Sequence, residues 1–179
     1  MGTIYSDQEI DALIKEQKPL PQNFISGIHF RRKLGHKEYD LDIKGENGNI
    51  FRIILRQNAS TPLDFSVILG YLPVNTSIIF RLRRYNGKSH EHTNKIEKSK
   101  FYNFHVHKAT ERYQSIGEDE DKYAEPTDRF YDFYSALQCM LNDCGFITPE
   151  GSQLQLLQEK HSWLLRILNM IFIIKYALN

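Results

Sequence analysis

The sequence has few of the residues that mark specialised architectures. Only two cysteines and one tryptophan occur among its 179 residues. Cys139 and Cys144 are too few and too close together for a disulfide framework, and the C-x4-C spacing alone is not a zinc signature. We expect them to be reduced thiols that pack as small apolar side chains. Internal repeats and low-complexity linkers are absent as well, which argues against a repeat protein.

A net charge of one sign is also missing, since the formal charge at pH 7 is only +1. The bulk charge therefore identifies no partner, but its distribution is uneven. From Arg81 to Arg112 there are nine Lys or Arg residues against three Glu, whereas residues 118–121 are all acidic. A local basic stripe suits the phosphate backbone of a nucleic acid, although a solvated surface has the same composition.

The composition is that of a globular chain with a well-filled core. Apolar residues make up 41% of the sequence and aromatic residues 12%. The length favours one domain, and we place it at residues 1–150, followed by a C-terminal helix at 151–179. The first residues are polar and amphipathic rather than a signal pattern, so we expect a cytoplasmic protein.

Hydrophobic periodicity predicts an α+β fold. Ser6 and Glu9 form a capping box before a short amphipathic helix, which Pro19 and Pro21 end. Short strands with turns between them follow, and this favours an antiparallel meander of about five or six strands. Gly35 and the Asn47-Gly48 pair mark two of the turns. The expected strands are 25–34, 38–45, 49–57, 65–72, 77–86 and 100–108.

Two helices are predicted after the strands. Residues 126–144 have apolar side chains at helical spacing, with Pro126 near the first turn and Gly145 at the end. We expect this helix to pack on the apolar face of the sheet. The second helix, within 151–179, is apolar nearly all round, which requires burial in the core or in a homodimer interface. It is short for a membrane span and is interrupted by Arg166, Asn169 and Lys175, so a membrane role is disfavoured.

Strand alternation predicts a basic sheet face. In residues 80–85, Phe80 and Leu82 alternate with Arg81, Arg83 and Tyr85. A basic and aromatic face can bind single-stranded RNA by phosphate contacts and base stacking. The alternative is a solvent face that carries arginine for solubility.

Four of the seven histidines occur as two H-x-H pairs, His90 with His92 and His105 with His107. Two residues apart on a strand, the members of a pair share one face. Three interpretations are open: a metal site, an acid–base centre for cleaving RNA, or a hydrogen-bonded ladder without chemistry. His90-x-His92-x4-Glu97 looks like the first metal motif of the cupins, but that motif's upstream glycine is Arg84 here. We therefore predict no metal and no other cofactor.

Acid–base cleavage of RNA is the leading hypothesis from the residues. RNA carries its own nucleophile, so a protein needs a general base, a general acid and groups that stabilise the phosphate. Histidine suits both proton transfers because its ordinary pKa lies near neutrality. The predicted catalytic residues are His90, His92, His105 and His107. The predicted nucleic-acid contacts are Arg81, Arg83, Arg84, Tyr85, Lys108, Arg112 and Tyr113.

A family resemblance points the same way. The segment "FRLRRYN", followed by a histidine pair, a gap and then "FHVHKA", resembles the core of TumE-type toxins of bacterial toxin–antitoxin systems. The match covers Phe80 to Lys108 and implies a small toxin that acts on RNA and is neutralised by an antitoxin. It carries over only to Arg84, Tyr85, His105 and His107.

In length and layout the chain also resembles uncharacterised small proteins of prophages and mobile elements. The rival hypothesis is therefore a non-enzymatic inhibitor of the anti-defence or anti-CRISPR type. Its basic sheet face would bind a host defence protein or a nucleoprotein complex, and its histidines would be structural.

Overall fold

The computed structural model describes residues 3–154. They form two compact units, one of residues 3–19 and 29–147 and a smaller one of residues 20–28 and 148–154. In the smaller unit Phe24 and Leu154 are buried, and the Gln22 side chain donates a hydrogen bond to the carbonyl of Glu150. Beyond residue 154, the helix predicted for 151–179 lies outside the described residues. None of the helices within 3–154 is long and apolar enough to cross a membrane.

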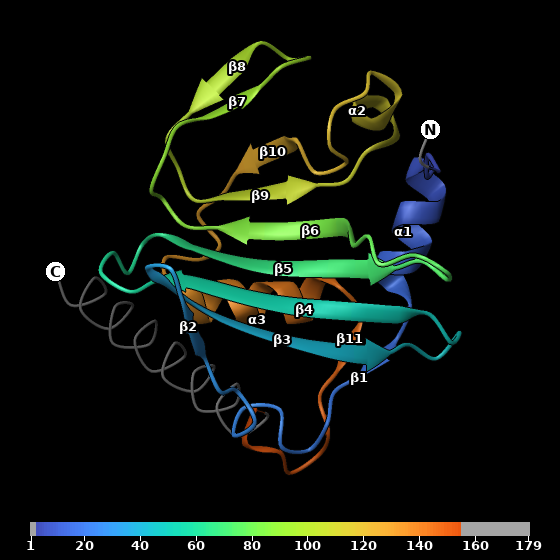
Figure 1. Ribbon diagram of the computed structural model, residues 1–179, viewed down its shortest axis with the longest axis vertical. Helices are drawn as coiled ribbons and strands as arrows, with labels where there is room; N and C mark the ends of the chain where they lie inside the picture. Colours follow the sequence, from blue (N-terminus) through green and yellow to red (C-terminus); the bar gives the residue numbers. More distant parts are fainter. Residues whose placement is uncertain (1–2, 155–179) are drawn as a thin grey trace, which may run out of the picture. The chain divides into compact units, whose positions relative to one another are not determined.

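An antiparallel sheet of seven strands dominates the larger unit (Figure 1). Its strand order is β10-β9-β6-β5-β4-β3-β2, so β2 to β6 form a meander and the α+β prediction is confirmed. The elements are α1 (Asp7–Lys15), β1 (Lys18–Pro19), β2 (Arg31–Lys33), β3 (His36–Lys44), β4 (Ile50–Asn58), β5 (Phe65–Leu72), β6 (Phe80–Asn86), β7 (His92–Asn94), β8 (Ser99–Phe101), β9 (His105–Lys108), α2 (Glu111–Ser115), β10 (Tyr123–Pro126), α3 (Phe133–Asp143) and β11 (Phe146–Ile147).

The local signals read from the sequence account for much of this order. Ser6 and Glu9 form the predicted capping box of α1. Gly35 and Gly48 have φ of +87° and +88° in the turns on either side of β3, a backbone conformation in which a Cβ is unfavourable. The predicted strand at 100–108 is divided instead: β8 ends at Phe101, and β9 begins at His105.

Helix α3 packs on β5 and β6 and buries one face of the sheet. Val67 and Leu69 from the sheet and Leu137 and Met140 from the helix are 2% exposed or less. The helix begins later than predicted, because Asp132 and Ser135 form a capping box there. Pro126 ends edge strand β10 instead, where its missing N–H costs no bond inside the sheet.

A β-bulge in β6 changes the predicted faces. Leu69 and Gly70 of β5 are neighbours, yet they pair with Arg83 and Arg81, so Leu82 is the extra residue. A bulge shifts the alternation by one position. As a result Tyr85 lies on the α3 side, where its hydroxyl donates to Asp143, and Arg84 lies on the opposite face. The prediction of one face shared by Arg81, Arg83 and Tyr85 was wrong for this reason.

A buried lysine joins the ends of two helices. Lys18 is 0% exposed, and its Nζ lies 4.2 Å from the centre of the Phe51 ring. Burial lowers the pKa of Lys18 to about 8. Its ammonium lies within 3.0 Å of four backbone carbonyl oxygens, those of Leu13, Ile14, Glu16 and Cys144. These carbonyls terminate α1 and α3, where helix geometry leaves them without partners.

Lys18→Met should destabilise the protein by about 2 kcal/mol, because methionine fills the space but leaves the buried carbonyls without a donor. The free energy of unfolding from urea titration at pH 7 measures the effect. Lys15→Met, at an exposed position of α1, is the matched control and should change stability by less than about 0.5 kcal/mol. Equal stability of the two variants would contradict the capping role.

Candidate metal centre

The pairing of β9 with β6 places two histidines on the sheet face opposite α3. His105 lies across from Asn86 and His107 across from Arg84. Because the residues between them point to the other face, His105, His107, Arg84 and Asn86 form one polar group. Strand β9 thus presents two imidazoles, beside Arg84 and Asn86 of β6, on a face where an antiparallel sheet commonly carries solvent-facing side chains.

The β7–β8 hairpin adds a third histidine. The chain leaves the sheet after β6, forms this hairpin and returns as β9 (Figure 1). The side chain of Asn94 then fixes β7 to β10, since its amide donates to the carbonyl of Ala124 and its oxygen accepts from the Ala124 N–H, at 2.8 and 2.9 Å. Two residues earlier on β7, His92 is placed against β9.

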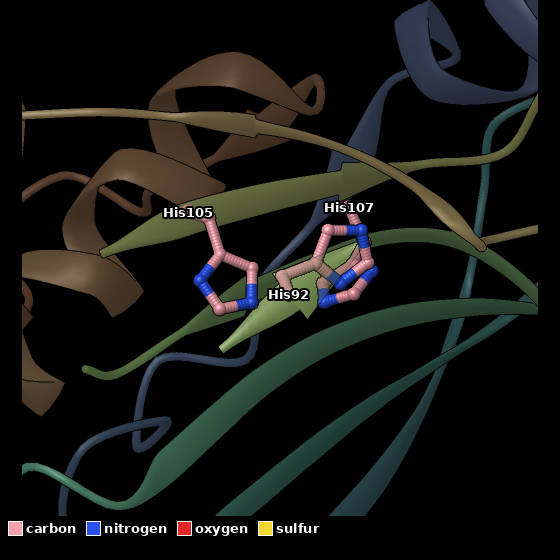
Figure 2. A group of neighbouring side chains, drawn as sticks. All are labelled: His92, His105 and His107. Carbon is pink, nitrogen blue, oxygen red and sulfur yellow. The ribbon is translucent and has the colours of Figure 1, made fainter. Parts of the chain in front are cut away.

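His92, His105 and His107 form a compact buried cluster (Figure 2). Their exposed fractions are 8%, 0% and 2%. One ring nitrogen from each lies within 4.8 Å of the others. The ring centres of the three pairs are 4.7 to 5.4 Å apart.

Hydrogen bonds define which nitrogen of His105 carries the proton. Its Nδ1 lies 2.7 Å from the carbonyl oxygen of Asn103, which can only accept, so Nδ1–H is the donor. Its Nε2 is buried and has no hydrogen-bond partner. A buried lone pair without a donor is costly, which makes Nε2 of His105 the unsatisfied atom of the cluster.

The proton positions of the other two imidazoles also follow from oxygen atoms that can only accept a hydrogen bond. His107 donates from Nδ1 to the carbonyl of Asp121 at 2.8 Å, and its Nε2 accepts from the Asn86 amide at 3.2 Å. His92 donates from Nε2 to the Asn94 side-chain oxygen at 2.9 Å, because that oxygen already accepts from a backbone N–H. Each imidazole therefore donates to a carbonyl oxygen with one nitrogen and keeps a lone pair on the other.

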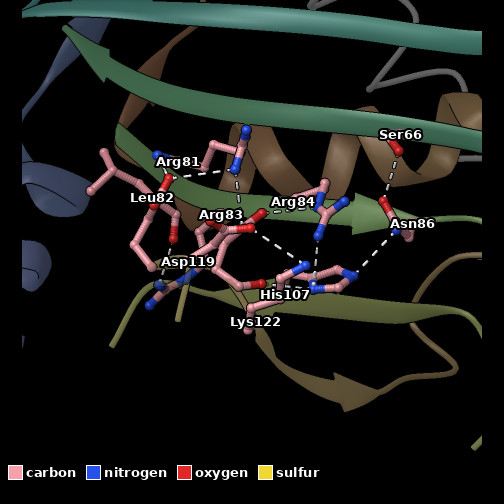
Figure 3. A network of polar contacts seen from close by, with 11 residues as sticks. Ser66, Arg81, Leu82, Arg83, Arg84, Asn86, His107, Asp119 and Lys122 are labelled. Carbon is pink, nitrogen blue, oxygen red and sulfur yellow. Dashed lines mark hydrogen bonds and ion pairs between the residues drawn. The ribbon is translucent and has the colours of Figure 1, made fainter. Parts of the chain in front are cut away.

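A polar network supports this arrangement from β5 and β6 (Figure 3). Ser66 donates to the Asn86 oxygen at 2.8 Å, and that contact orients the Asn86 amide toward His107. The Arg84 guanidinium lies 3.1 Å from Nδ1 of His107 and 3.0 Å from the carboxylate of Asp121. Asp121 is 1% exposed and also pairs with Arg81, so two cations balance one buried carboxylate.

These surroundings keep the imidazoles neutral. Burial lowers the pKa of His105 to about 4, and the other histidines and Arg84 contribute to this shift. Burial likewise lowers the pKa of His107, and the positive charge of Arg84 lowers it further. The pKa of His92 is lowered by burial too, although the Asn94 side chain and the Lys122 backbone act in the opposite direction. Neutral imidazole is the form that binds metals.

The donor set suits a transition metal. Three neutral imidazoles without a carboxylate fit zinc and its neighbours, and they fit magnesium or calcium poorly. On a tetrahedral ion with Zn–N bonds of about 2.1 Å, the nitrogens lie about 3.4 Å apart. The ring nitrogens of the three histidines are up to 4.8 Å apart, so rotations of the side chains must bring them about 1.4 Å closer together to reach this distance. Such a closure would displace the Asn86 amide from His107.

The remaining predicted catalytic residue, His90, is exposed and lies beside the cluster. Its ring centre is 5.7 Å from that of His105. Glu97, the acidic position of the cupin-like spacing, is not part of the cluster. Its carboxylate accepts a hydrogen bond from Tyr113 and forms an ion pair with Arg112. The sequence thus identified three members of the cluster but overlooked Asn94, Asn103 and Asp121, whose side chain or carbonyl sets the proton positions.

The predicted nucleic-acid contacts are largely engaged within the protein. Ion pairs join Lys108 to Glu125, Arg112 to Glu97, and both Arg81 and Arg84 to Asp121. Arg83 donates to the carbonyl of Leu82.

The two tyrosines among the predicted nucleic-acid contacts have buried rings. Tyr85 is 1% exposed and Tyr113 is 0% exposed. Both hydroxyls donate to carboxylates, Tyr85 to Asp143 and Tyr113 to Glu97. Stacking a base requires an exposed ring face, which neither side chain has.

Compared with protein families, curated proteins and solved structures, the chain shows no match.

In chelator at pH 7, His105 and His107 should be neutral with the proton on Nδ1, and His92 neutral with the proton on Nε2. The hydrogen bonds to three carbonyl oxygens impose these tautomers. Long-range 1H–15N correlation spectra of the histidine rings measure them directly. A doubly protonated ring, or the opposite tautomer at His105, would contradict the assigned network.

Proposed function

We propose that this protein binds a divalent transition metal, with zinc the best fit, through His92, His105 and His107. The observation that carries the proposal is the buried Nε2 of His105, which lacks a partner beside two further imidazoles. Metal-bound histidines characteristically donate their second nitrogen to a carbonyl or carboxylate, as all three rings do here. A bound ion would supply the partner that Nε2 of His105 lacks.

The proposed role of the metal is to fix the β7–β8 excursion onto the sheet. Few apolar side chains hold this segment, since the buried residues of β7 and β8 are His92 and Asn94. His92 belongs to the hairpin, whereas His105 and His107 belong to β9. An ion shared between them would cross-link the two, as structural zinc does in small domains.

Acid–base cleavage of RNA is supported less well by the same contacts. A general acid must hold a proton near neutral pH, whereas burial keeps His105 and His107 unprotonated. The cations near them are ion-paired inside the protein. The RNA hypothesis and its anti-defence rival stay predictions, and an RNA arm in the experiment below tests the first.

Zinc should bind with a stoichiometry of one and raise the melting temperature of chelator-treated protein. At 100-fold excess over the Kd, the gain of about 2.7 kcal/mol corresponds to roughly 8 °C for a chain of this size. Isothermal titration calorimetry and thermal scans measure both effects. Failure of zinc, cobalt and nickel to bind the folded, chelator-treated protein would overturn the proposal.

His105→Phe should abolish the response to zinc while preserving the fold, because phenylalanine keeps the ring contact with Phe101 but cannot ligate. His29→Phe, at an exposed position outside the cluster, should respond like the wild type. Incubation with RNA in EDTA provides the second readout. Cleavage in EDTA that His105→Phe removes would favour the metal-independent nuclease instead.

A further inference from the structure

The three-histidine cluster leaves one position of a tetrahedral ion unfilled, and few side chains are near enough to take it. The Arg84 guanidinium offers only donors, and the Asp121 carboxylate is occupied by Arg81 and Arg84. Phe101 packs against His92 and His105 without a ligand atom. Among the described neighbours of the cluster, His90 is the remaining side chain with a nitrogen lone pair to give.

The ring of His90 lies close enough to the cluster to become a ligand after a side-chain rotation. Its ring lies edge-on to His105, with an interplanar angle of 88° and ring centres 5.7 Å apart. Two imidazoles on one tetrahedral zinc have ring centres about 5 Å apart, given Zn–N bonds of about 2.1 Å. His90 precedes His92 by two residues and lies in the bend at residues 88–90 that leads into β7.

A short relay sets the proton of His90 as well. The Ser89 hydroxyl donates to the Asp64 carboxylate at 3.0 Å, so its hydrogen is used there. His90 Nδ1 lies 3.1 Å from the same hydroxyl oxygen and must therefore be the donor in that contact. This leaves the lone pair on Nε2 and links the ring through Ser89 to a carboxylate, an outer shell typical of metal-bound histidine.

We infer that His90 is the fourth ligand and closes a four-histidine site built from two H-x-H arms. This inference rests on the metal-binding proposal and deepens it, because a closed site is structural and has no open position for a substrate. The exposed His90 side chain must rotate as well as the three buried imidazoles, since its nitrogen is not within the 4.8 Å group. The two arms come from the segment before β8 and from β9, so the ion cross-links them at four points.

Cobalt substitution of the full-length protein tests the geometry. Wild-type protein should show intense tetrahedral Co2+ absorption that does not change with pH, whereas His90→Ala, with water in the fourth position, should show weaker absorption that changes near neutral pH as that water ionises. Zinc affinity of His90→Ala should fall by at least the roughly 10- to 100-fold that loss of an outer-shell partner costs. His90→Cys should restore tetrahedral absorption and add a thiolate-to-cobalt charge-transfer band.

Two variants distinguish a wrong fourth ligand from the absence of a metal site. Because His90 is exposed, its replacement should leave the far-UV circular dichroism and the melting temperature in chelator unchanged. If His90→Ala keeps the wild-type affinity and cobalt spectrum while His105→Phe loses binding, His90 is not a ligand and the three-histidine site stands. If the wild type binds no metal, both fail.

Discussion

The antiparallel pairing of β6 with β9 is the constraint on which the rest of the candidate site depends. It joins two strands that are separated in sequence by the whole β7–β8 excursion. Pairing His107 with Arg84 and His105 with Asn86 directs both imidazoles to the face opposite α3. The excursion must then lie over that face, which brings His92 to the same point. One register therefore converts two separated H-x-H pairs into a single cluster.

Electrostatics decides what such a cluster can do. Buried charge is expensive, so three imidazoles in contact cannot all be protonated. Arg84 adds a cation beside them and shifts the balance further toward neutral rings, while Asp121 compensates the arginine. Three carbonyl oxygens accept one ring proton each, so each neutral imidazole keeps a lone pair on its other nitrogen. This environment disfavours a proton donor and favours a ligand for a soft or borderline cation.

The fold was predictable from sequence where a local rule applied, and the site only in part. Capping at Ser6, the turns at Gly35 and Gly48, and strands β3 to β6 follow from short-range chemistry, whereas the strand expected at 25–34 is formed only at residues 31–33, as β2. The bulge at Leu82 does not, because one inserted residue leaves the alternating pattern apparently intact while it exchanges the faces on which Tyr85 and Arg84 lie. Strand β10 was also missed, since its pairing with β9 is a tertiary contact. The histidines were identified, but their burial and partners depend on both of these features.

Composition alone leaves the charge balance of the basic segment undecided. Arginine, lysine, histidine and tyrosine in one segment are what a phosphate site requires, yet the same side chains also satisfy one another and neighbouring carboxylates. Here Lys108 pairs with Glu125 and Arg112 with Glu97, and both tyrosine hydroxyls donate to acidic side chains. A basic stripe in sequence becomes a nucleic-acid surface only if its charges remain uncompensated after folding. The acidic run that ends at Asp121 folds back onto two of the arginines, so Glu120 and Asp121 compensate the charges of Arg81 and Arg84.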